Sequence, residues 1–127
     1  MNTDETSTLY RPVGQKELDL IRQSNWREFP PRLFWQPIFY PVLTEDYAIL
    51  IARDWNTKDP NSDYVGYVLQ FEVRKAYLDQ HEPHEAGGQE LKEYWISAEE
   101  LGQFNDNIIG RIEVIHEFRP VEEKEER

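Results

Sequence analysis

The clearest two-residue alternation along the chain lies in Tyr64–Arg74, where every second residue is apolar. This period is typical of a β-strand with one buried face, because successive side chains point to opposite sides. The residues expected on the buried face are Val65, Tyr67, Leu69, Phe71 and Val73. Ile108–Phe118 is rich in β-branched residues and nearly alternating, so it predicts a second strand. Glu93–Ile96 is a shorter aromatic and β-branched run that predicts a third.

Helical spacing marks two main segments of the chain. Thr44–Trp55 begins with a good N-cap residue and carries acids in its first turn. The stripe expected to be buried on this helix is Tyr47, Ala48, Ile51 and Trp55. Gln15–Ser24 predicts a shorter helix with an apolar face. A further helical segment is expected to start with Ser97 as its N-cap and to end at Asn105–Asn107.

The segments around prolines predict a strand edge and an irregular crossing. Thr8–Val13 is expected as a short strand, and Pro12 places it at an edge because proline has no N–H to donate. Trp26–Pro41 holds four prolines and six aromatic residues in sixteen positions, which forbids a regular helix. We expect an ordered crossing with a short strand near Ile38–Tyr40. Its rings either pack over the core or form the wall of a ligand cleft.

The length of 127 residues fits one domain with a single core. We expect this domain to span residues 8–119, between a flexible tail at residues 1–7 and a charged tail at residues 120–127. Hydrophobic residues make up 39% of the chain and aromatic residues 13%, which argues against a disordered protein. The predicted elements together describe an α+β fold with a split, mixed or antiparallel sheet and two main helices.

Acidic residues outnumber basic residues by 25 to 14, giving a net charge of −11. This balance argues against binding to nucleic acid or to an anionic membrane, since both call for a basic face. It is compatible with a basic protein as partner. The chain has no cysteine, which excludes disulfides and thiolate metal sites. It also shows no signal peptide pattern and no apolar run near the roughly 20 residues of a membrane span, so we expect a soluble cytoplasmic protein.

The common motifs of nucleotide-binding loops, zinc proteases and serine hydrolases are absent from the sequence. His81 and His84 have a spacing that can suit a metal. They lie on a loop with proline and glycine, and no further ligand is evident, so we expect no metal.

Arg11, Glu93 and several aromatic residues remain as candidates for chemistry. Arg11 offers a planar fork for a phosphate or a carboxylate. Tyr40, Tyr47 and Trp95 offer ring faces for a flat heterocycle. Glu93 can bond a ribose hydroxyl or stabilise a developing oxocarbenium ion. This set suits a dinucleotide whose N-glycosidic bond is broken.

Several stretches also resemble a known family, namely TLYRPVGQKEL, PIFYPVLTEDYA, IARDWN and EYWISAEELGQFNDNIIGRIEVI. From Leu9 to Phe118 the chain looks like a group of short bacterial proteins labelled ADP-ribosylation/crystallin J1. The order of its predicted elements is similar to the ADP-ribosyltransferase fold. The resemblance implies an enzyme that uses NAD, or an ADP-ribose-like ligand, without a metal. It assigns Arg11 to contact with NAD, Tyr40 or Tyr47 to the nicotinamide side, and Glu93 to the catalytic acid.

Other functions stay open beside this one. Leu91 stands where protein-modifying transferases often carry Gln or Glu, which leaves room for a ligand-binding domain with a degenerate cleft. A non-catalytic acidic interaction module, of the immunity type, is a further alternative. Arg11 would then only pair with a neighbouring acid, Glu93 would be an exposed strand residue, and Trp95 would belong to the core. The position of Arg11 and Glu93 relative to Tyr40 or Tyr47 discriminates between these functions.

Overall fold

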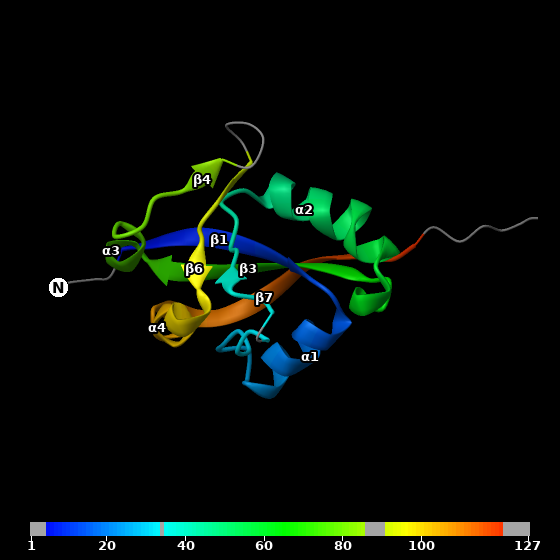
Figure 1. Ribbon diagram of the computed structural model, residues 1–127, viewed down its shortest axis with the longest axis horizontal. Coiled ribbons are helices and arrows are strands. Elements are labelled where there is room, and N and C mark those ends of the chain that lie inside the picture. The colour runs from blue at the N-terminus through cyan, green and yellow to red at the C-terminus, as the bar shows by residue number, and fades with distance from the viewer. Residues whose placement is uncertain (1–4, 34, 86–90, 121–127) are drawn as a thin grey trace, which may run out of the picture.

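A computed structural model of the protein has three long antiparallel strands at its centre (Figure 1). They are β1 (Thr6–Val13), β3 (Gly66–Arg74) and β7 (Ile108–Phe118). β3 lies between the other two strands and pairs antiparallel with both. The strongest alternation in the sequence therefore belongs to the central strand. The strand that contains Pro12 lies at an edge of this sheet, as predicted.

The structure describes residues 5–33, 35–85 and 91–120, so most of both expected tails lies outside it. β1 begins at Thr6, inside the segment expected as the N-terminal tail. Among the residues that the structure describes, no helix is long and apolar enough to cross a membrane.

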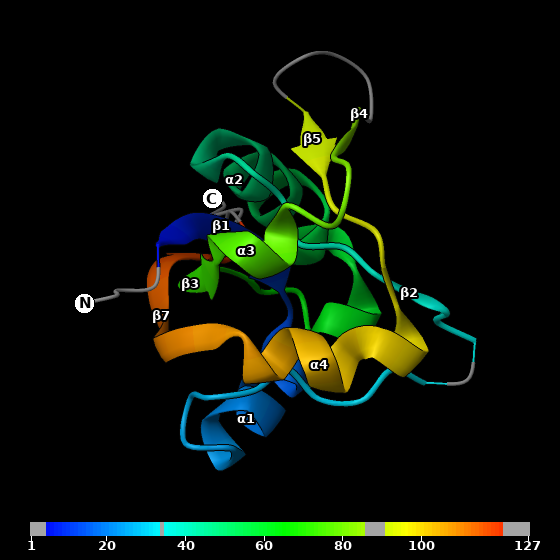
Figure 2. The same cartoon turned by 90° about the vertical axis from the view of Figure 1, so that its left-hand side faces the viewer.

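Helices cover both faces of the main sheet. They are α1 (Gln15–Gln23), α2 (Glu45–Asp54), α3 (Lys75–Leu78) and α4 (Leu101–Asp106). In Figures 1 and 2, α2 lies on one side of the strands, while α1 and α4 lie on the other. Thr44 caps α2 as predicted, because its hydroxyl accepts a 3.2 Å hydrogen bond from the Tyr47 backbone N–H. This places the start of α2 close to the site described below.

The alternation of β3 divides the core between the two faces. Leu69 and Phe71 point to the side of α1 and α4, where a group of fully buried phenylalanines gathers. These phenylalanines are Phe29, Phe39, Phe71 and Phe104. Val68 points the other way and packs against Ala48 and Ala52 of α2. The small alanines let α2 approach the sheet closely, since a Cβ on Gly66 of β3 would lie only 2.2 Å from the Ala52 carbonyl oxygen.

Two short antiparallel pairs lie beside the main sheet. β2 (Ile38–Phe39) pairs with β6 (Ile96–Ser97), and β4 (His84–Glu85) pairs with β5 (Lys92–Glu93). All strand pairs in the described residues are antiparallel. The Pro-rich crossing contains the short strand that we expected near Ile38–Tyr40.

Two local predictions are wrong, and a third holds only in part. The run Glu93–Ile96 is not one strand, because its two ends pair with different partners and the residues between them pair with neither β2 nor β4. Trp55 is 71% exposed and not part of the buried stripe, since α2 ends there and the chain turns into a 3₁₀ segment. Ser97 stands at the N-cap position of Ala98–Glu100, as predicted, although its side chain makes no capping hydrogen bond.

Candidate functional site

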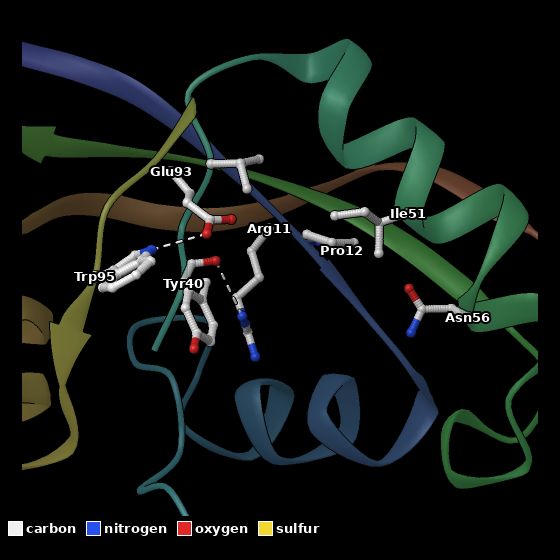
Figure 3. A pocket seen from close by; sticks show the side chains of 8 residues that line it. Arg11, Pro12, Tyr40, Ile51, Asn56, Glu93 and Trp95 are labelled. Carbon is white, nitrogen blue, oxygen red and sulfur yellow. Dashed lines mark hydrogen bonds between the residues drawn. The ribbon is translucent and has the colours of Figure 1, made fainter. Parts of the chain in front are cut away.

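An open groove of about 410 Å³ lies between α2 and the segments that follow β2 and β5 (Figure 3). β1 forms its floor with Arg11 and Pro12. The residues that line the groove are Arg11, Pro12, Tyr40, Val42, Ile51, Asn56, Glu93 and Trp95. The groove thus gathers residues from distant parts of the sequence.

Val42 is the residue that joins these parts. It forms an isolated antiparallel bridge with Tyr10 of β1 on one side and with Glu93 on the other. The Tyr10–Val42 bridge has both backbone hydrogen bonds, at 2.9 and 2.8 Å. On the other side, the backbone N–H of Tyr94 donates to the carbonyl of Pro41 at 2.9 Å. These bonds tie Glu93 to the edge of the main sheet, with the Val42 segment between Glu93 and β1.

Pro12 explains why the edge opens into a groove. In an antiparallel pair the residues that exchange hydrogen bonds recur every second position. Tyr10 exchanges both bonds with Val42, so the next such pair would be Pro12 with Tyr40. Proline has no N–H to offer, and the ladder therefore stops after one bridge. The edge of β1 beyond this point stays open and lines the groove.

The carboxylate of Glu93 is held by two donors. The hydroxyl of Tyr47 donates to Oε1 at 3.0 Å, and the indole N–H of Trp95 donates to Oε2 at 2.9 Å. Burial, together with the hydrogen bond to Glu93 and its charge, raises the pKa of Tyr47 to about 12. The phenol therefore stays protonated and remains a donor at neutral pH. The two bonds fix the direction of a carboxylate that lines the groove.

Two aromatic rings form a wall of the groove. Tyr40 and Trp95 meet edge to face, with ring centroids 6.1 Å apart and an interplanar angle of 88°. His84 stacks on Trp95 at a centroid distance of 4.0 Å and an angle of 11°. Tyr40 is 39% exposed and Trp95 is 48% exposed, so neither belongs to the core. The alternative of Trp95 as a core residue is thus wrong, and about half of its surface is exposed although His84 covers one face of the ring.

Arg11 is positioned by an acid of α1. Its Nε and Nη2 donate to the two oxygens of Glu17 at 2.7 and 2.9 Å, which is a bidentate pair. Its Nη1 donates to the carbonyl of Tyr40 at 3.4 Å, and its guanidinium carbon lies 4.6 Å from the centre of the Phe39 ring. Figure 3 shows this side chain beside the Tyr40 ring. An anionic ligand would therefore share Arg11 with Glu17.

Arg32 is a second cation beside Arg11. Its guanidinium carbon lies 5.7 Å from the same Phe39 ring, and its Nε is buried without a hydrogen-bond partner among the described residues. Burial lowers the pKa of Arg32, and the charge of Arg11 lowers it further. Two guanidinium groups thus stand near one carboxylate, Glu17, whose two oxygens both bond Arg11. The cation pair can accept an anion next to the Tyr40 wall.

The predicted site residues fall close together. Arg11, Tyr40, Glu93 and Trp95 all line the groove, and Tyr47 reaches it through its bond to Glu93. Whether they bind NAD stays a prediction. The Pro-rich crossing serves both expected purposes, because some of its rings are in the core and Tyr40 is in the groove wall.

Sequence reasoning missed Pro12, Val42, Ile51 and Asn56 as groove residues, and it missed Arg32 as the second cation beside Arg11. Arg32 lies outside helices and strands, and Asn56 lies in the short 3₁₀ segment after α2, where spacing does not predict the direction of a side chain. The aromatic and proline-rich composition around Arg32 was the one available signal, because it marked that segment as a cleft wall.

The two histidines considered for a metal have other neighbours. Nε2 of His81 lies 2.7 Å from a carboxylate oxygen of Glu100, which also accepts a hydrogen bond from the Tyr77 hydroxyl. His84 stacks on Trp95. Within the described ranges, no group of three or more His, Cys, Asp or Glu side chains is placed to hold a metal ion.

Comparison with known proteins finds no relative: no family model matches the chain, and no curated protein or solved structure matches it either.

Proposed function

We propose that the groove binds NAD and that the protein breaks its N-glycosidic bond, by hydrolysis or by transfer of ADP-ribose. One observation carries this proposal: Arg11, Tyr40, Glu93 and Trp95, which come from separate parts of the chain, line the same groove. A ring-walled hollow with a few convergent polar groups is the usual form of a small-molecule site. The resemblance to the ADP-ribosyltransferase fold supports the same choice of ligand.

The chemistry at Glu93 would follow from its fixed carboxylate. When the bond between ribose C1′ and the nicotinamide nitrogen breaks, the electron pair leaves with nicotinamide and positive charge develops on the ribose. A carboxylate near C1′ stabilises that charge. Water or an acceptor hydroxyl then forms the new bond to C1′ and loses its proton to the medium. Tyr47 and Trp95 orient Glu93 for this role through their hydrogen bonds.

The remaining groups would hold the rest of the ligand. The exposed ring of Tyr40, and the part of the Trp95 ring that His84 does not cover, offer stacking surfaces for nicotinamide. Arg11 and Arg32 offer guanidinium groups for the pyrophosphate, a role for which their planar forks are well suited. Glu17 keeps Arg11 in place while the groove is empty.

The test is NAD turnover by the wild type and by Glu93→Gln. We expect the wild type to release nicotinamide and the variant to be slower by about 100-fold or more, because the charge that stabilises the transition state is lost. Glu99→Gln is the matched control, since Glu99 is an exposed acid of the 3₁₀ segment after β6. A wild-type protein that never consumes NAD under any condition would remove the catalytic proposal.

A binding protein without catalysis is the second candidate. It is favoured by the completeness of the polar network: both oxygens of Glu93 and both of Glu17 already accept hydrogen bonds. In that case NAD or ADP-ribose would raise the melting temperature by mass action but would be recovered intact. A thermal-shift series with NAD, ADP-ribose and nicotinamide, followed by analysis of the recovered ligand, separates the two candidates.

A further inference from the structure

Asn56 carries an unusual acceptor at the end of the groove away from Trp95. Its side chain lines the groove next to Ile51 (Figure 3). Its Oδ1 is buried and finds no donor in the described residues. Buried polar atoms in folded proteins nearly always have a partner, because water no longer satisfies them. Such an orphan on the wall of a groove points to a donor that arrives with a ligand.

The orientation of this amide is fixed by its neighbours. The single proton of the Ser62 hydroxyl is donated to Asp59 at 3.0 Å, so Ser62 can only accept from Asn56. It does so from Nδ2 at 2.9 Å. The amide nitrogen is therefore the atom bound to Ser62, and the oxygen is the atom left over. Exchange of the two atoms would break the bond to Ser62.

Close packing holds Ser62 in turn. A Cβ on Gly14 would lie 2.6 Å from the Cβ of Ser62, so the two backbones approach as closely as only glycine allows. Ser62 is 5% exposed. The direction of the acceptor on Asn56 is thus fixed, and a ligand bonds to it once the groove side chains that cover Oδ1 in the empty protein move aside.

The groove residues around this acceptor indicate which kind of ligand group it would bind. Pro12 and Ile51 are the neighbouring groove residues, and both are apolar. A flat heterocycle suits such walls, and an amide oxygen selects an N–H donor at its rim. An exocyclic amine, as on adenine, supplies that donor. A carbonyl in the same place, as on hypoxanthine, would put two acceptors against each other.

We propose that the Asn56 end of the groove binds an amino-substituted heterocycle and that Oδ1 of Asn56 accepts a hydrogen bond from its exocyclic amine. This inference rests on the proposed function, because it assigns the adenine of the dinucleotide to that end. It adds selectivity for the base of the ligand, which the residues at the Glu93 end do not provide.

The experiment measures binding of ADP-ribose and of its hypoxanthine counterpart by calorimetry. Wild-type protein should bind ADP-ribose about tenfold more tightly, in line with the gain from one hydrogen bond to a buried acceptor. Asn56→Ala should bring the two affinities to within about twofold, mainly by weakening the binding of ADP-ribose. Ser62→Ala should reduce the preference as well, since it frees the amide to turn without touching the ligand. Urea unfolding of both variants checks that they fold.

Each result has a clear meaning. A wild-type protein that binds both ligands equally overturns the inference and leaves NAD turnover, measured separately, to decide the proposed function. A preference that survives Asn56→Ala in a folded protein also overturns it. Binding of neither ligand overturns the inference together with the proposed function.

Discussion

Replacement of Glu17 by glutamine should lower stability and raise affinity for an anionic ligand at the same time. The side chains of Arg11 and Glu17 are only 11% and 21% exposed, and two short hydrogen bonds join them. Removal of one partner from a buried pair costs about 3–5 kcal/mol in the free energy of unfolding. Glutamine keeps one acceptor for the guanidinium, so we expect a loss of about 2–3 kcal/mol.

A double-mutant cycle isolates the pair. Arg11→Met keeps an unbranched apolar stem without the guanidinium group and its charge, and the double variant should lose less than the sum of the two single losses. The difference should be about 1–3 kcal/mol, the range for residues in direct contact. Urea unfolding gives the free energies from the midpoint and slope. Asp19→Asn is the control on the same helix, because its 3.6 Å contact with Arg22 is exposed and should contribute less than about 1 kcal/mol.

Ligand binding gives the second half of this prediction. With Glu17 neutral, Arg11 no longer shares its donors with a charged neighbour, so ADP-ribose should bind more tightly to Glu17→Gln than to wild type. Calorimetry measures the two dissociation constants. A loss of stability below about 0.5 kcal/mol, within the range of ordinary surface changes, would refute the assignment of a buried pair. If Arg11 plays no part in holding the ligand, ADP-ribose should have the same dissociation constant with Glu17→Gln as with wild type. That result would make Arg11 a structural residue only.

Three further results are expected from the same structure. Phe104→Ala should lower the free energy of unfolding by about 3–5 kcal/mol in urea experiments, because the ring is fully buried among other aromatic rings; a loss below about 1 kcal/mol would contradict its place in the core. Gly66→Ala should prevent normal folding because its Cβ would collide with the Ala52 backbone. Gly102→Ala in α4 meets nothing within 4 Å and should raise the free energy of unfolding by about 0.5–1 kcal/mol. Circular dichroism and thermal melts of the two variants test this contrast. The pKa of Tyr47 is raised to about 12 from an ordinary 10, so the neutral phenol stabilises the folded state below pH 10 and this contribution is lost as the pH rises from 10 to 12. The difference in urea midpoint between wild type and Tyr47→Phe should therefore shrink across this window. A difference that stays constant with pH would contradict the prediction.

The sequence predicts those parts of the fold that local rules decide. The alternation in Tyr64–Arg74 gives the central strand, and the threonine cap gives the start of α2. Pro12 correctly marks an edge strand because the missing N–H is a property of the residue itself. The run Glu93–Ile96 was misread because its break depends on two separate partners, β4 and β2. Propensity cannot supply that information.

The residues of the candidate site also fall into those that the sequence predicts and those that it does not. Arg11 and Glu93 were selected for their chemistry, and the structure brings both to one groove. Their partners could not be selected, because the pairing of Glu17 with Arg11 and the orphan oxygen of Asn56 arise only when helices and loops dock. The exposure of Trp55 has a related cause, since helical spacing alone does not say where a helix ends.

The position of Val42 has a consequence for how the site is assembled. The three main strands pair with each other without it, whereas the backbone of Glu93 is joined to β1 through the bridges that Val42 makes on both sides. Each bridge is a single residue pair, whereas the main strands pair along whole ladders, so the bridges are the contacts that open most easily. A chain with its sheet complete and this one residue undocked would have native strand content and no groove. Recovery of ligand binding, and not recovery of the circular dichroism signal, would therefore mark the end of refolding.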